Sequence, residues 1–152
     1  MASSEVVGSP QQFLISTFYV GSSLMGIDTM KVQEVIRMTD MTTVFHAPAH
    51  ILGIINLRGK IVTIIDLARK LELHRPGVTK ESRIIIVEWN DEYVGLLVDQ
   101  ISDAMYVDRG SLMPPPSNIQ ELQGRFFEGV FNSGGHLIAI VDVGRVLADT
   151  EK

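Results

Sequence analysis

An internal repeat with a separation of 76 residues limits the folds open to this chain. Residues 53–71 and 129–147 align without a gap, and 7 of the 19 aligned positions are identical. These identities are Gly53/Gly129, Asn56/Asn132, Gly59/Gly135, Ile64/Ile140, Asp66/Asp142, Arg69/Arg145 and Leu71/Leu147. A weaker match at a separation of 69 pairs Gly26 with Gly95 and Glu34 with Asp103. An offset that holds over a whole segment indicates duplication, so the chain is predicted to contain two related units.

Each unit is predicted to consist mainly of β-strands. Valine and isoleucine occur 16 times each, against 7 alanines, and β-branched side chains favour a pleated sheet over a long helix. Turn residues divide the chain into short elements: strands over 13–20, 24–28, 31–38, 53–57, 60–65, 83–89, 93–98, 101–107, 126–131 and 137–141, with short helices over 66–71 and from Asp142. Closure removes the exposed edges of a small sheet, so we predict two small β-barrels that share an apolar layer.

The chain is expected to fold as one domain with two subdomains. Residues 1–11 are small and polar and are expected to form a flexible leader, followed by a single domain over 12–149. Its subdomains should span roughly 12–74 and 82–149. Cores of this size are marginal alone, so the subdomains should pack against each other. The sequence leaves open whether each barrel keeps its own strands or exchanges some with its neighbour.

Charge and composition argue against several classes of function. The 13 basic and 18 acidic side chains give a net charge of −5, the wrong sign for neutralising a nucleic-acid backbone. The chain has no cysteine, which excludes disulfides and thiolate chemistry. No signal peptide and no apolar run of about 18 residues is present, so we expect a cytoplasmic protein without direct membrane insertion.

The motifs of catalysis are incomplete in this sequence. Five residues separate Gly53 from Gly59, instead of the four of a phosphate-binding loop, and Ile61 replaces the hydroxyl residue that would bind Mg²⁺. No serine occupies a nucleophile elbow. His46 and His50 are separated by Pro48 and have few acids near them. We therefore expect no catalytic residue, no metal and no cofactor.

The two repeats differ at the tip of the clearest hairpin. Leu57-Arg58 in the first repeat aligns with Ser133-Gly134 in the second. Both halves must fold, so shared positions are assigned structural roles as turn or cap residues: Gly53, Asn56, Gly59 and Asp66. Positions that differ have room for function, and arginine suits carboxylate recognition because its planar guanidinium stays charged. The alternative is that Arg58 is a solvated turn residue.

Glu34 is an acid within a β-branched run, and Val32 should lie on the same face of that strand. The pair is either an ordinary solvent-facing pattern or part of a contact surface. The two halves of the chain also differ in charge, because residues 1–76 carry +1 and residues 77–152 carry −6. This asymmetry is compatible with two different partners.

Several motifs together resemble the CheW family, the coupling proteins of bacterial chemotaxis, over residues 12–148. They occur in order: Val-Gln-Glu-Val at 32–35, Pro48, Gly-Ile-Ile-Asn-Leu-Arg-Gly at 53–59, a β-branched run over 61–67 that ends in Asp-Leu, and Val-Gly-Leu-Leu-Val-Asp at 94–99. The chain departs at Thr63, where this family usually has proline. Threonine is a good strand residue, so only the local strand edge is affected.

The resemblance implies two five-stranded barrels, SH3- or OB-like in kind, around a common core with short helices. It implies a non-catalytic adaptor that joins the cytoplasmic tips of methyl-accepting chemoreceptors to the regulatory domain of the histidine kinase CheA. Such an adaptor is expected to be a monomer in isolation and to be recruited to receptor arrays at the membrane. By the same resemblance, Arg58, Glu34 and Val32 are expected to contact partners, mainly the receptor. Leu57, beside Arg58 at the hairpin tip where the repeats differ, is also expected to bind a partner.

Two other classes of function stay open at this point. A small barrel can bind a small ligand or an oligonucleotide, although the ten aromatic residues are scattered and the charge is acidic. A hydrolase with a spatially assembled site is the third alternative, ranked last.

Overall fold

The computed structural model describes residues 11–74, 77–114, 118–119 and 122–148, and two five-stranded sheets make up most of it. Sheet 1 contains, in spatial order, β11 (Phe127–Ser133), β12 (His136–Val141), β2 (Ser23–Asp28), β1 (Gln12–Val20) and β8 (Gln100–Asp108). Sheet 2 contains β3 (Val32–Arg37), β6 (Arg83–Trp89), β7 (Glu92–Val98), β5 (Lys60–Asp66) and β4 (Ile51–Leu57). The prediction of a mostly β fold with two five-stranded units is confirmed.

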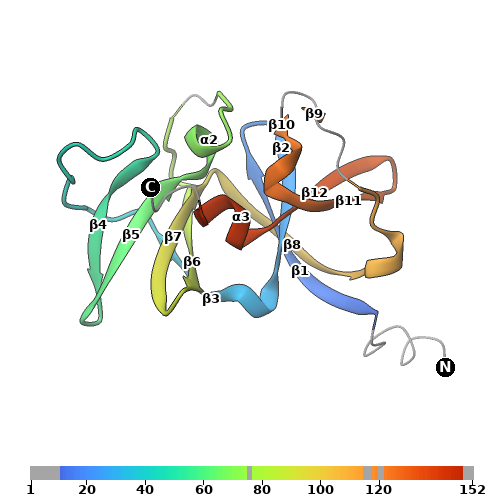
Figure 1. The fold of residues 1–152 in the computed structure, drawn as a ribbon, viewed down its shortest axis with the longest axis horizontal. Helices are drawn as coiled ribbons and strands as arrows, with labels where there is room; N and C mark the ends of the chain where they lie inside the picture. Colours follow the sequence, from blue (N-terminus) through green and yellow to red (C-terminus); the bar gives the residue numbers. More distant parts are fainter. Residues whose placement is uncertain (1–10, 75–76, 115–117, 120–121, 149–152) are drawn as a thin grey trace.

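Short elements connect and cover these sheets. They are η1 (Thr29–Lys31), α2 (Leu67–Lys70), η2 (Arg109–Ser111), the ladder of β9 (Asn118–Ile119) with β10 (Leu122–Gln123), η3 (Gly124–Phe126) and α3 (Val143–Ala148). Figure 1 shows the sheets side by side, sheet 2 at the left and sheet 1 at the right, with α3 between them in this view. No helix among the described residues is long and apolar enough to cross a bilayer.

The two halves of the chain exchange strands, which the sequence had left open. Sheet 1 combines β1 and β2 with β8, β11 and β12, and sheet 2 combines β3, β4 and β5 with β6 and β7. A parallel pairing joins the two halves in each sheet: β2 with β12, and β5 with β7. Neither half of the chain therefore completes a sheet without the other.

The hydrogen-bonded ladders do not close into full barrels, contrary to our expectation. In sheet 2, the segment after edge strand β3 reaches the opposite edge strand at one point, where Thr42 N and Ile54 N each donate to the other residue's carbonyl, at 2.9 and 2.8 Å. In sheet 1, Met113 and Val130 form the equivalent bridge, with two bonds of 2.9 Å. Among the described residues, each sheet is thus fastened across its opening by a single bridge.

Gly53 and Gly129, which occupy the same position in the two repeats, directly precede the bridge residues Ile54 and Val130. A Cβ atom at Gly53 would lie 2.5 Å from the carbonyl oxygen of Thr42, and one at Gly129 would lie 3.1 Å from the carbonyl oxygen of Met113. The crossing backbone therefore leaves no room for a side chain at Gly53 and little room at Gly129.

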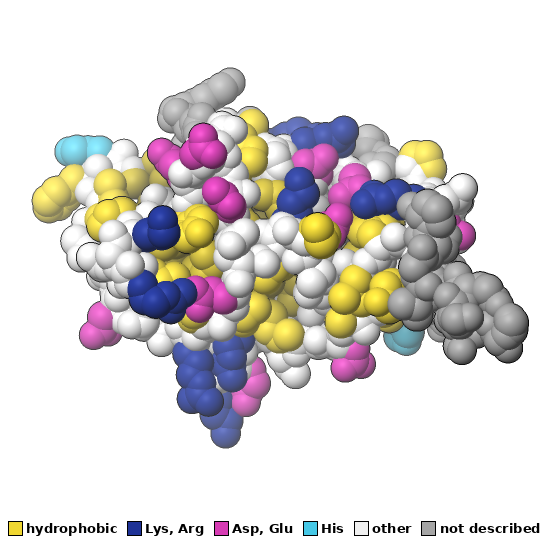
Figure 2. Space-filling model, turned by 90° about the horizontal axis from the view of Figure 1, so that it is seen from below, with side chains coloured by type: hydrophobic (Ala, Val, Ile, Leu, Met, Phe, Trp, Pro, Cys, Tyr) yellow, Lys and Arg dark blue, Asp and Glu magenta, His cyan; other side chains and the backbone are white. Residues whose placement is uncertain are grey.

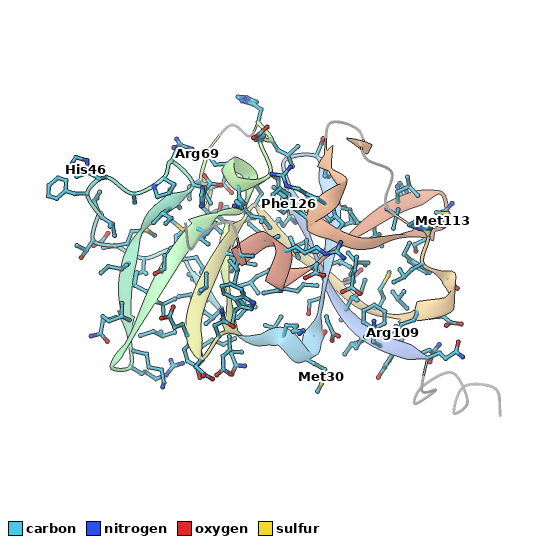
Figure 3. All side chains as sticks on the ribbon, viewed as in Figure 1. Met30, His46, Arg69, Arg109, Met113 and Phe126 are labelled. Atoms are coloured by element: carbon cyan, nitrogen blue, oxygen red, sulfur yellow. The ribbon has the colours of Figure 1, made fainter. Side chains whose placement is uncertain are left out.

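Three apolar clusters fill the molecule. The central cluster lies between the sheets and takes residues from both, including Phe18 and Leu96, together with Phe126 of η3; Phe126 is labelled at the centre of Figure 3. A second cluster fills the concave side of sheet 2, and a third fills that of sheet 1. Strand β6 shows the alternation: Ile84 and Ile86 belong to the sheet 2 cluster, and Ile85 and Val87 to the central one. The expected shared apolar layer is confirmed.

The shared polar residues of the repeats make the same bonds in both halves. At each hairpin tip, an asparagine Oδ1 accepts the N–H of the glycine three residues later, from Gly59 to Asn56 at 2.8 Å and from Gly135 to Asn132 at 3.0 Å. Asp66 accepts the N–H of Ala68 at 3.1 Å and caps α2. These bonds fix turns and helix starts and leave the tip side chains to vary.

Candidate functional site

Arg58 stands at the tip of the β4–β5 hairpin in an uncommon backbone conformation. Its φ is 52°, and the φ of Gly59 is 86°, the pair of positive values that a type I′ turn requires. Asparagine, aspartate or glycine normally occupies the first of these positions, and arginine there is uncommon. Because such a residue is less favourable for the turn itself, its side chain is a candidate for a role outside the fold.

The structure brings Arg58 together with Glu34 of β3, 24 residues earlier in the chain. Strands β3 and β4 are the two outer strands of sheet 2, so this ion pair spans the opening between them. The Arg58 side chain is 69% exposed and that of Glu34 is 32% exposed. The guanidinium is therefore accessible from outside, and the carboxylate beside it orients it.

Val32 and Leu57 flank this ion pair but are partly buried. Val32 packs against the central cluster and Leu57 against the sheet 2 cluster. Each presents only part of its surface to a partner, so both also help to hold the strands that carry Glu34 and Arg58. The expectation that Val32 shares a face with Glu34 is wrong, because the register of the β3–β6 pairing shifts between them: Val32 is opposite Val87 of the central cluster, and Glu34 is opposite Ile86 of the sheet 2 cluster.

Two exposed apolar residues on the strands that carry this ion pair or follow it in sequence were not singled out from the sequence. Ile61 is 61% exposed on β5, and Val35 is 44% exposed on β3. Val62 and Ile64 are fully buried on the opposite face of β5, but the sequence of β5 has apolar residues on both faces and does not single out Ile61. We define the tip site as Arg58, Glu34, Val32, Leu57 and Ile61.

A hollow of about 410 Å³ adjoins the tip site. Its walls are formed by Lys60, Ile61, Thr63, Glu88, Asp91, Glu92 and Tyr93. Figure 2 shows the molecule from below. At the left of this view, basic and acidic side chains border apolar surface. The arrangement offers a fixed cation, carboxylates and exposed apolar surface, which are the elements of a protein-binding surface.

The structure offers little for other chemistry at the positions it describes. No group of three or more histidine, aspartate or glutamate side chains there is arranged to hold a metal ion. His46, labelled at the left of Figure 3, lies in the loop between β3 and β4. Fully buried isoleucines fill the concave side of sheet 2 where a small ligand would bind.

A second charged cluster lies on sheet 1. Arg109, labelled in Figure 3, stacks on the ring of Phe13 with its Cζ 3.9 Å from the ring centroid. Its guanidinium lies 3.5 Å from Asp28 Oδ2 and 3.6 Å from Glu128 Oε1. Arg109 follows β8 and Glu128 belongs to β11, the two outer strands of sheet 1, so this pair also spans an opening. The sequence contained no repeat or motif that pointed to it.

Glu128→Gln should change how the stability of the protein depends on pH. Burial raises the pKa of Glu128 above its usual 4.5, and the nearby Arg109 opposes this shift only in part. Glu128 thus stabilises the fold below its unfolded-state pKa, and this contribution is lost as pH rises through the folded-state pKa. The glutamine variant stays neutral, so the corresponding decline should disappear from its unfolding free energies, measured by urea denaturation at acidic and neutral pH. A pH profile parallel to that of the wild type would contradict this expectation.

Comparisons with known proteins agree on one family. The family model described as CheW-like domain matches residues 15–151. The chemotaxis protein CheW of Rhizobium meliloti is 33% identical over 135 residues, which cover 89% of this chain and 87% of that protein. The CheW of Klebsiella aerogenes is 32% identical over 147 residues, with 97% and 86% covered. Among solved structures, the scaffolding protein TtCheW of Thermoanaerobacter tengcongensis matches with a TM-score of 0.84 and 33% identity, and the match covers 93% of this chain and 91% of that one.

Proposed function

This chain belongs to the CheW family, and we propose that it is a non-catalytic adaptor that couples the tips of chemoreceptors to the histidine kinase CheA. Membership makes chemotaxis signalling its setting. Its specific partners, and its recruitment to receptor arrays at the membrane, are part of the proposal.

The observation that carries the proposal is the accessible ion pair of the tip site. Only one of the two repeats has a charged hairpin tip, because Gly134 stands where the other has Arg58. A guanidinium that is 69% exposed and oriented by Glu34, with the exposed Ile61 three residues further along the hairpin, can receive a carboxylate and an apolar side chain of a partner together. We assign this site to the receptor.

An adaptor of this kind needs no chemical step. Its task is to hold two proteins in a fixed geometry, which suits two sheets that share one central core. Contacts that are modest one by one become strong when many are linked, because each bound partner raises the effective concentration of the next. The kinase is assigned to a surface other than the tip site, so that both partners bind at once.

A three-component capture experiment tests the bridging. The full chain, a CheA regulatory domain and a receptor hairpin fragment are mixed, and the receptor fragment is immobilised. We expect the kinase domain to be retained at a higher level when this chain is present than when it is omitted. If this chain bound the immobilised receptor fragment only when the kinase domain was absent, the two partners would compete for one site. That result would refute the adaptor function.

A further inference from the structure

A pair of arginines faces each other where β3 ends. Arg37 and Arg83 are directly opposed in the β3–β6 ladder, which places their Cα atoms about 5 Å apart. Directly opposed like charges destabilise a sheet, and such an arrangement persists where another requirement outweighs the cost. No carboxylate of the described residues forms an ion pair with Arg37, Arg83 or the adjacent Lys80.

The Arg83 side chain is held in place by its own turn. Its Nη1 donates to the carbonyl oxygens of Lys80 and Ser82, at 2.9 and 2.8 Å. The turn is itself bonded, because Thr79 N donates to Ser82 Oγ at 3.0 Å and Ser82 N donates to the Thr79 carbonyl oxygen at 3.1 Å. One guanidinium is therefore preorganised, and Arg37 beside it is exposed on an outer strand.

We propose that Arg37 and Arg83 form a docking surface for an acidic segment of a protein partner, distinct from the tip site. A protein segment fits better than a free phosphate or a lipid headgroup because Val35, 44% exposed, lies two residues before Arg37 on the same face. The surface thus combines two cations with an apolar contact. In a chain of net charge −5, a local positive surface also orients an acidic partner during approach.

The surface is separated from the tip site along β3. Glu34 precedes Arg37 by three residues, about 10 Å along a strand. The proposal does not depend on the receptor assignment, because the two surfaces use different arginines and are tested with different variants.

The test uses the full chain and a fluorescent helical peptide in which glutamates spaced four residues apart flank leucines. Arg37→Gln should weaken binding of this peptide about tenfold, measured by fluorescence anisotropy at about 0.15 M salt, because a charge-assisted contact is lost. Lys31→Gln is the matched control, since it removes the same charge from another exposed position, and it should change binding less than about twofold. Equal losses of peptide affinity in the two variants would show that binding depends only on the net charge of the chain, and would overturn the proposal.

Two further measurements separate docking from the alternatives. If Arg37 is retained for binding, Arg37→Gln should raise the melting temperature by about 1 to 3 °C, because the cross-strand repulsion is relieved; a fall of several degrees would show a structural role instead. Inorganic phosphate and vesicles with anionic lipids should compete poorly with the peptide. Displacement of the peptide by either at equal ionic strength would overturn the proposal in favour of an anion or membrane site.

Discussion

Gly53→Ala should lower the free energy of unfolding by about 2 to 4 kcal/mol, which combines overpacking with loss of a two-bond bridge. The added methyl group would lie 2.5 Å from the carbonyl oxygen and 3.2 Å from the carbonyl carbon of Thr42. These are backbone atoms, which cannot rotate away as a flexible side chain can. The bridge between Thr42 and Ile54, which fastens sheet 2, would have to open. Urea denaturation of the purified variant measures the loss.

Gly129→Ala is the matched control for Gly53→Ala. It occupies the same position in the second repeat, but its added methyl group would meet the nearest atoms at 3.1 and 3.2 Å. A shift of a few tenths of an ångström accommodates these contacts, so the destabilisation should be less than half as large. If both variants lost the same stability, the cause would be the strand propensity of glycine and not the crossing backbone.

Arg58→Ala should weaken binding to a receptor hairpin fragment by roughly 30-fold or more, because truncation of one partner in an interfacial charge pair costs about 2 kcal/mol or more. The free energy of unfolding should change by less than about 1 kcal/mol, since exposed ion pairs contribute little to stability. Calorimetric titration and thermal melting of the same preparation measure the two effects. Undiminished binding would remove the receptor from the tip site, and a melting point lowered by many degrees would make Arg58 a structural residue.

A double-mutant cycle with Glu34 separates the two roles of the ion pair. Glu34→Gln should weaken receptor binding less than Arg58→Ala, because Glu34 is assigned to orienting the guanidinium. The double variant Glu34→Gln/Arg58→Ala should bind no more weakly than Arg58→Ala alone. Additive losses would instead show that each residue makes its own contact with the partner.

The hairpin tip was predicted as a candidate site because Leu57 and Arg58 lie at repeat positions that differ. An acid within a β-branched run pointed to Glu34 and Val32, and the resemblance then implied partner contacts for these two residues and Arg58. Their meeting across the opening of sheet 2 was not predictable, because residues on opposite outer strands are neighbours only when the sheet curls. Ile61 was missed because β5 carries apolar residues on both faces: Ile65, on the same face as Ile61, is fully buried, as are Val62 and Ile64 on the other face.

The contacts of Arg37 and Arg109 had no signal in the sequence. Arg37 lies opposite Arg83 only in the observed register of the β3–β6 pairing. A shift of one residue would move the two arginines apart. Arg109 meets Glu128 only because β8 and β11 are the two outer strands of one sheet. Both facts depend on which strands pair, and short-range patterns do not encode that choice.

The amino-acid order alone determined the β-rich character, the duplication, the turns and the helix caps, since each depends on residues close in sequence or on a constant offset between repeats. Tertiary structure decided which strands share a sheet, how single bridges replace barrel closure, and where the charged side chains meet. The reason is that a β-strand leaves its hydrogen-bonding groups to be satisfied by a neighbour of any sequence separation, and burial of the central apolar layer selects that neighbour. Patterns of residues close in sequence therefore determined the strands, turns and helix caps of this protein, and long-range packing determined where its interaction surfaces lie.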